Sequence, residues 1–89
     1  MPQRTATIAS RVGLHARPAS IFIAAVAQQT VPVTISKDGS APLNAASILS
    51  IMSLGAGHGD VVTLEADGAG ADEALAELVA LLETDLDAD

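Results

Sequence analysis

The chain has 89 residues and a formal net charge of −7, from 11 Asp and Glu against 4 Lys and Arg. This length suits one domain over residues 1–89 with a single modest core and excludes a second domain. The acidic balance argues against nucleic acid or an anionic membrane as partner, because both bind basic surfaces, and the absence of cysteine excludes a disulfide framework and a thiolate metal site.

The first expected element is a strand over residues 3–9, where polar and apolar side chains alternate from Thr5 to Ile8. This segment lacks the unbroken apolar stretch of a signal peptide. No later apolar run approaches the roughly 20 residues that a membrane span needs. We therefore expect a soluble, cytosolic protein.

A helix is predicted over residues 16–28. Pro18 fits the first helical turn, where its missing N–H would have no partner in any case. Apolar residues continue at helical spacing, and Phe22 and Val26 lie four residues apart on the same face. We expect that face to join the core.

The segment GLHARPA, residues 13–19, sets an imidazole and a permanent cation at the start of this helix. The first four N–H groups of a helix have no intrahelical partner, so the backbone at Ala16 and Arg17 can hold an incoming anion. The Arg17 cation and the helix N-terminus both disfavour imidazolium, which leaves His15 a lone pair for attack on phosphorus. His15 is therefore the candidate phosphoryl acceptor and Arg17 the candidate phosphate-stabilising group.

The alternative is an ordinary surface loop in which His15 and Arg17 are merely solvated. Gly13 before the histidine and Pro18 after it restrict the backbone on both sides, which a random exposed histidine would not need. This restriction favours the functional interpretation.

Two strands are expected next. The first covers residues 31–36, with Val33 and Ile35 on its core face. Asp38-Gly39 then predicts a tight hairpin that returns the chain through a short strand near residues 41–43.

Residues 47–54 predict a short amphipathic helix that Ser47 caps through its hydroxyl group. Apolar side chains in this segment exceed what one buried face of so small a domain needs, so we expect some of them to form an exposed patch that contacts a partner. The candidate interface residues are Ile48, Leu49, Ile51 and Met52.

Three alternate glycines over residues 55–59 end that helix. The run GAGHG superficially resembles a phosphate-binding glycine loop, but it opens no helix, so we interpret His58 as a loop histidine. Residues 61–66 then predict a fourth strand rich in β-branched side chains.

The final helix has the clearest pattern. Its apolar stripe consists of Leu75, Leu78, Val79 and Leu82. Asp72 and Glu73 fall in its first turn, where the helix dipole favours negative charge. An acidic tail follows from about residue 84, and we assign only solubility to its residues Asp85, Asp87 and Asp89.

The element order is βαββαβα, which predicts a small α+β sandwich: helices cover one face of a four-stranded sheet and leave the other to solvent. GLHARPA together with SILSIMSLG, residues 47–55, resembles the HPr family, the histidine-containing phosphocarriers of the bacterial phosphoenolpyruvate:sugar phosphotransferase system. The resemblance implies an open-faced β-sandwich with an antiparallel sheet in the order 1-4-2-3 and three helices on one face.

The resemblance also implies the chemistry. His15 would take phosphate on Nδ1 from phosphorylated enzyme I, as pros-phosphohistidine, and pass it to enzyme IIA domains of sugar permeases, while Arg17 assists the phosphate. It implies a carrier rather than a complete enzyme, with no cofactor and no metal, and we expect a monomer. Enzyme I and enzyme IIA would dock on the 48–54 surface and on the first helix, where Ala24 and Ala27 replace the polar residues of many relatives.

Ser47 aligns with the serine that an ATP-dependent kinase modifies in many Gram-positive relatives, where the product binds a transcription factor. Those relatives usually carry Lys before the serine, whereas this chain has Ala46, which argues against such regulation.

Three other functions stay open from the residues. One is a regulatory adaptor acting through Ser47 and the surface of residues 48–54, although relatives specialised for regulation tend to lose the histidine that this chain keeps. Another is a phosphocarrier devoted to nitrogen regulation. The third is a metal-dependent hydrolase with His15 as ligand, which would need a cluster of carboxylates or histidines in one cleft.

Overall fold

Four strands build one antiparallel sheet. The computed structural model describes residues 2–37 and 39–86. Its strands are β1 Gln3–Thr7, β2 Val33–Lys37, β3 Leu43–Asn44 and β4 Val61–Ala66. They pair in the order β1-β4-β2-β3, so the predicted strand order is confirmed.

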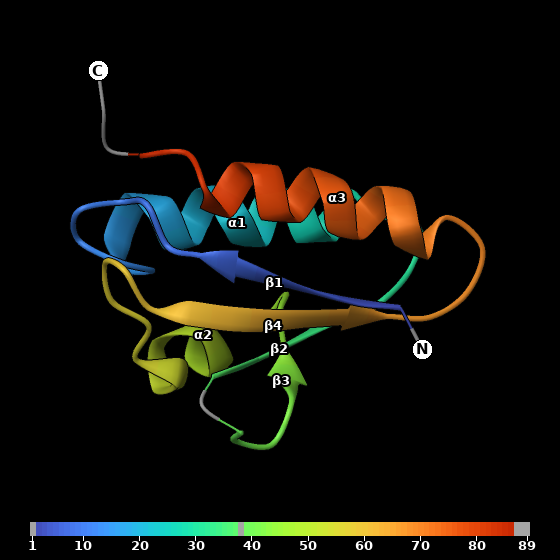
Figure 1. Ribbon diagram of the computed structural model, residues 1–89, viewed down its shortest axis with the longest axis horizontal. Coiled ribbons are helices and arrows are strands. Elements are labelled where there is room, and N and C mark those ends of the chain that lie inside the picture. The colour runs from blue at the N-terminus through green and yellow to red at the C-terminus, as the bar shows by residue number, and fades with distance from the viewer. Residues whose placement is uncertain (1, 38, 87–89) are drawn as a thin grey trace.

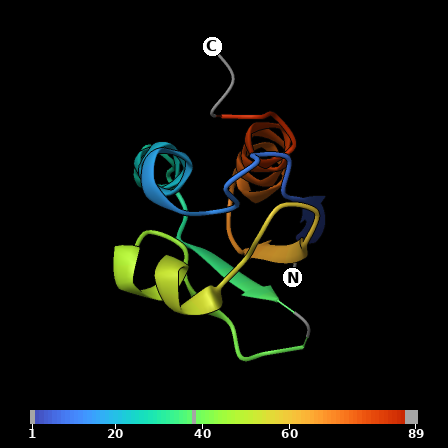
Figure 2. The same cartoon turned by 90° about the vertical axis from the view of Figure 1, so that its left-hand side faces the viewer.

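Three helices complete the fold: α1 Ala16–Ala27, α2 Ile48–Leu54 and α3 Ala71–Leu82. Helices α1 and α3 pack side by side over one face of the sheet, with α3 against β1 and β4 (Figures 1 and 2). Helix α2 contacts α1 and β3, so the helical layer extends from β1 at one edge of the sheet to β3 at the other. No helix within the described ranges is long and apolar enough to cross a membrane.

The core lies between the sheet and this helical layer. Phe22 is 0% exposed and Val26 is also buried, which confirms the predicted face of α1. The α3 stripe is confirmed as well, since Leu75, Leu78 and Leu82 are buried and Val79 is partly buried against them.

The opposite face of the sheet carries polar side chains. Thr63 in β4 stands between Thr5 of β1 and Ser36 of β2 in one row of the ladder. These hydroxyl groups tolerate water, so this face needs no covering layer. The open-faced sandwich is therefore confirmed.

Strand boundaries differ from the predicted ones where the backbone finds other partners. The first strand ends at Thr7 instead of residue 9, because Ile8 bonds to residues 59 and 60 and the Ala9 N–H donates to Leu82 O at the end of α3 (3.0 Å). The second and third strands begin directly after Pro32 and Pro42, which have no N–H to donate to a ladder.

The predicted hairpin turn is only partly testable, because Asp38 lies outside the described residues. Gly39 has φ +76°, a conformation that favours glycine.

The buried ring of Phe22 gives a direct test of the packing. Phe22→Ala is expected to lower the free energy of unfolding by about 3 to 5 kcal/mol, because it leaves a cavity under α1. Chemical denaturation monitored by far-UV circular dichroism measures this change. Leu49→Ala is the control: that side chain is 75% exposed, and its loss should change the stability by less than about 0.5 kcal/mol. Equal losses in the two variants would contradict the packing.

Candidate functional site

His15 lies at the point where an extended loop becomes helix α1. It is the N-cap residue, with φ −130° and ψ 163°, and its carbonyl accepts the N–H of Ala19 (3.4 Å). Its side chain is exposed and, within residues 2–37 and 39–86, makes no hydrogen bond or ion pair. The imidazole is therefore open to a second protein, and its position depends on the backbone that carries it.

The residue after the histidine has an unusual backbone. Ala16 has φ +49°, and it is the sole residue other than glycine with a positive φ in the described part of the chain. Left-handed backbone costs a residue with a Cβ atom about 1 to 2 kcal/mol. Such strain is found mostly at functional sites, where the surrounding structure holds it in place.

Positive charge at the site comes from Arg17 and from the N-terminus of α1. Arg17 is exposed, and the first turn of α1 contains no acidic residue. The unpaired N–H groups of this turn and the guanidinium therefore lie within a few residues of His15, and both attract an oxyanion.

Arg11, four residues before His15, shares its charge with a carboxylate of the same chain. Its Nε atom lies 3.5 Å from Oδ2 of Asp85, whose side chain is half-buried. The interpretation of the tail as a solubility feature alone is thus wrong for Asp85, because the chain folds back over the loop that precedes His15. Asp87 and Asp89 lie outside the described residues.

The loop before the histidine packs against a second loop, residues 55–60. The Leu14 N–H donates to Ala56 O (2.9 Å), and Leu14 itself is buried. Gly13 has φ +73°, and a Cβ atom added there would lie 2.6 Å from both Ala56 O and Gly57 Cα. Only glycine allows this approach, which explains why a glycine stands two residues before the histidine.

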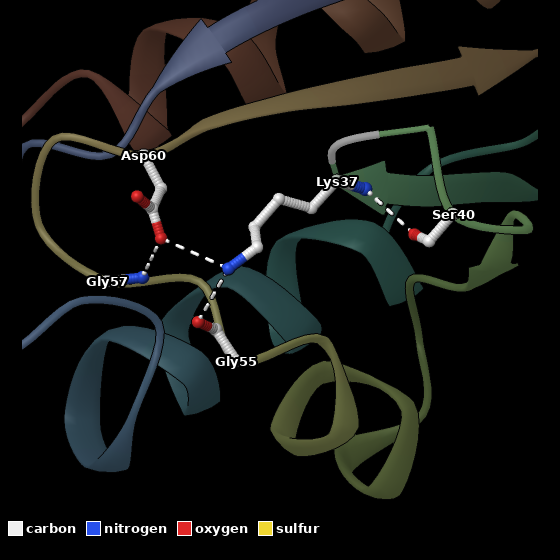
Figure 3. A network of polar contacts seen from close by, with 5 residues as sticks. All are labelled: Lys37, Ser40, Gly55, Gly57 and Asp60. Carbon is white, nitrogen blue, oxygen red and sulfur yellow. Dashed lines mark hydrogen bonds and ion pairs between the residues drawn. The ribbon is translucent and has the colours of Figure 1, made fainter.

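Two charged side chains hold the second loop in place (Figure 3). Asp60 Oδ2 accepts the N–H of Gly57 (2.8 Å) and a hydrogen bond from Lys37 Nζ (3.2 Å). Lys37 Nζ also donates to Gly55 O (3.1 Å). The hydrogen bond from the Gly57 N–H, then the hydrogen bond from Lys37 and its charge, lower the pKa of Asp60 below its usual 3.8.

Ser10 fixes the other end of the loop that leads to His15. It is 2% exposed, its hydroxyl accepts the N–H of Leu86 (2.9 Å), and its carbonyl accepts the N–H of Gly13 (2.9 Å). The same carbonyl lies 3.3 Å from Nδ1 of His58, an exposed loop residue as predicted. Within the described ranges, no three His, Cys, Asp or Glu side chains gather as metal ligands.

Helix α2 presents part of the predicted patch. Ser47 caps it by accepting the N–H of Ser50 (3.3 Å), which confirms the capping prediction. Ile48, Leu49 and Met52 are 46%, 75% and 58% exposed. Ile51 is 0% exposed, so its inclusion in the interface was wrong: its side chain points into the core on the opposite face of the short helix.

Lys37 and Asp60 were not predicted from the sequence to lie near the site. Asp60 follows Gly57 by three residues in a glycine-rich loop, a spacing at which a carboxylate can accept a local N–H. Lys37 is 23 residues away in the chain, so no local pattern could pair it with Asp60.

Known proteins similar to this chain match it over nearly its whole length. The family model described as PTS HPr component phosphorylation site matches residues 2–84. Phosphocarrier protein HPr of Streptomyces coelicolor is 45% identical over 82 residues, or 92% of this chain and 88% of that protein. HPr-like protein Crh of Bacillus subtilis is 37% identical over 86 residues, or 97% of this chain and 100% of Crh. The crystal structure of HPr-C-His from Thermoanaerobacter tengcongensis aligns with a TM-score of 0.91 and 38% identity, over 100% of this chain and 99% of that one.

The contact of Gly13 with the second loop is testable by adding one methyl group. Gly13→Ala is expected to destabilise the fold by at least about 2 kcal/mol, from left-handed strain and from the clash with Ala56 and Gly57. Gly59→Ala is the matched control, since Gly59 has φ +85° but no atom within 4 Å of an added Cβ. It should cost only about 1 kcal/mol of strain. Urea denaturation of both variants checks this, and equal losses would contradict the close contact.

The lowered pKa of Asp60 predicts how stability depends on pH. Ionised Asp60 stabilises the fold at pH values above the pKa that Asp60 has in the unfolded chain. This contribution is lost as the pH falls through the lower pKa that Asp60 has in the folded protein. The parent should therefore melt at a higher temperature than Asp60→Asn at pH 7, and the gap should close as the pH falls below 3.8. Calorimetry over a pH series measures the gap, and a gap that widens in acid would contradict the assignment.

Proposed function

Because the chain belongs to the HPr family of phosphotransferase-system phosphocarriers, we propose that His15 accepts a phosphoryl group from phosphorylated enzyme I and passes it to an enzyme IIA domain. The observation that carries the proposal is the exposed, unpaired His15 at the N-cap of α1, followed at once by the strained Ala16 and the exposed Arg17. In this role the protein is modified and discharged in turn, as a shuttle between two enzymes.

Transfer requires a neutral imidazole. The Nδ1 lone pair forms a bond to phosphorus while the bond between phosphorus and its donor atom on enzyme I breaks, and the ring proton stays on Nε2. Catalysis of such a step comes mostly from positioning and from stabilising charge on the phosphoryl oxygens. The Arg17 guanidinium and the free N–H groups of the α1 N-terminus supply that stabilisation, and they serve equally when the phosphoryl group leaves for enzyme IIA.

Docking of both enzymes would use exposed apolar side chains on helices α1 and α2. Ile48, Leu49 and Met52 are exposed on α2, and Ala24 and Ala27 are exposed on α1, which contacts α2. Exposed apolar side chains of this kind form the centre of many protein interfaces. With small alanines on α1, docking should depend more on apolar contact than on charge steering.

A regulatory adaptor is the second candidate, favoured by the similarity to Crh. Ser47 is partly exposed at the N-terminus of α2, where a phosphate would be tolerated electrostatically. The structural role of its hydroxyl as a cap for Ser50 and the presence of Ala46 both favour the carrier function over this one.

The proposal is tested by intact-protein mass spectrometry after incubation with phosphoenolpyruvate and an active enzyme I. We expect one phosphate on the parent that acid removes, and none on His15→Ala. An acid-stable phosphate that appears instead with ATP and a serine kinase, and disappears in Ser47→Ala, would support the adaptor. Absence of any acid-labile phosphate, with the enzyme I shown active on another carrier, would overturn the carrier proposal.

Arg17→Ala should keep the fold and slow phosphoryl transfer to His15 by about 100-fold, as expected when one group that stabilises the reacting oxygens is removed. Rapid-quench measurement of phosphohistidine formation checks the rate. Arg4→Ala is the matched control, because it removes the same charge from the start of β1, at the far end of the sheet (Figure 1). Equal rates for Arg17→Ala and Arg4→Ala would remove Arg17 from the mechanism.

A further inference from the structure

The charged side chains of Lys37 and Asp60 form hydrogen bonds with backbone groups of the loop of residues 55–60. Asp60 stands just before β4 and Lys37 ends β2, the strand paired with β4. Lys37 Nζ reaches Gly55 O and the Asp60 carboxylate, and the carboxylate accepts the Gly57 N–H. The Lys37 side chain is 22% exposed and the Asp60 side chain 43%, so the ion pair itself adds little to stability, and its effect lies in the two backbone groups that it holds.

The sheet itself does not need these side-chain contacts. Strands β2 and β4 pair through their own ladder, which runs from Val33 opposite Ala66 to Lys37 opposite Val62. What the two side chains add is a fixed position for residues 55–57, which connect α2 to the turn before β4. Figure 3 shows Lys37 and Asp60 reaching this segment from two sides.

Ala56 lies between Gly55 and Gly57, whose backbone groups bond to the two charged side chains. Its carbonyl accepts the N–H of Leu14 (2.9 Å), and Gly13 packs against it without room for a Cβ atom. Leu14 directly precedes His15. A shift of the Ala56 carbonyl must therefore either break the bond to Leu14 or move the backbone that carries the imidazole.

His15 is sensitive to such a shift, because its own side chain has no hydrogen bond or ion pair within the described ranges. Transfer between two proteins needs the reacting atoms aligned, and a misplacement of about 1 Å can cost about 100-fold in rate. The placement of His15 is thus set through its backbone, by the loop in contact with it.

We propose that Lys37 and Asp60 are positioning residues for phosphoryl transfer at His15, acting through Ala56 and Leu14. This inference rests on the proposed function. Neither side chain touches the phosphoryl group in this role: together they hold the loop, and the loop holds the residue before the histidine.

Asp60→Ala and Lys37→Met test the proposal with phosphorylated enzyme I as donor. We expect kcat for phosphorylation of His15 to fall about tenfold in each, with KM for this protein within about twofold of the parent, because alignment is impaired and docking is not. Lys37→Arg, which keeps a charged donor, should restore most of the rate. A rise in KM at unchanged kcat would overturn the proposal, because it would make this network part of the docking surface.

Amide hydrogen exchange tests the route independently of any enzyme. In Asp60→Ala the Leu14 N–H should exchange at least about tenfold faster than in the parent, while the Leu64 N–H in the centre of β4 keeps its protection. Equal acceleration at Leu14 and Leu64 would overturn the proposal, because the variant would then be generally destabilised.

Glu77→Gln is the control for charge. It also neutralises one carboxylate, but on the exposed side of α3, where Glu77 contacts Gln29. Its kcat, its KM and its Leu14 exchange should equal those of the parent. If the parent itself gains no phosphate on His15, the proposed function fails while Leu14 exchange still tests the positioning contact. If the parent is phosphorylated and both Asp60→Ala and Lys37→Met keep its kcat, the positioning role alone fails.

Discussion

The close contact of two loops at one end of the sheet is the constraint on which the candidate site depends. Gly13 approaches Ala56 and Gly57 so closely that a Cβ atom would lie 2.6 Å from their backbone, and Leu14 donates its N–H to Ala56. The contact joins the segment before α1 to the segment before β4, which are more than 40 residues apart in the chain. It fixes where α1 begins, and with it the position of His15.

The cationic side chains near this contact differ in their partners. Arg11 is paired with Asp85, and Lys37 is paired with Asp60 and bonded to Gly55. Arg17 has no ion pair among the described residues. In a chain of net charge −7, Arg17 and the N-terminus of α1 thus place positive charge close to His15.

The residues around His15 made the helix start readable from sequence, since Pro18 fits the first turn of a helix and His15 is the N-cap of α1. The predicted patch on α2 was only partly correct. Ile51 has the same apolar character as Ile48 and Leu49, but it is 0% exposed. In a helix of 7 residues whose side chains other than Ser50 and Ser53 are all apolar, the pattern cannot indicate which apolar side the rest of the protein covers.

The sequence by itself determined the helices, the core faces of β2 and α3, the cap at Ser47 and the candidacy of His15 and Arg17 for the site, because each depends on residues within about one or two turns of one another. Only the tertiary structure decided that Lys37 meets Asp60, that Asp85 pairs with Arg11 and that Gly13 packs on Ala56. These contacts join residues far apart in the chain, and their partners are selected by the packing of the sheet and helices. No spacing along the chain encodes them.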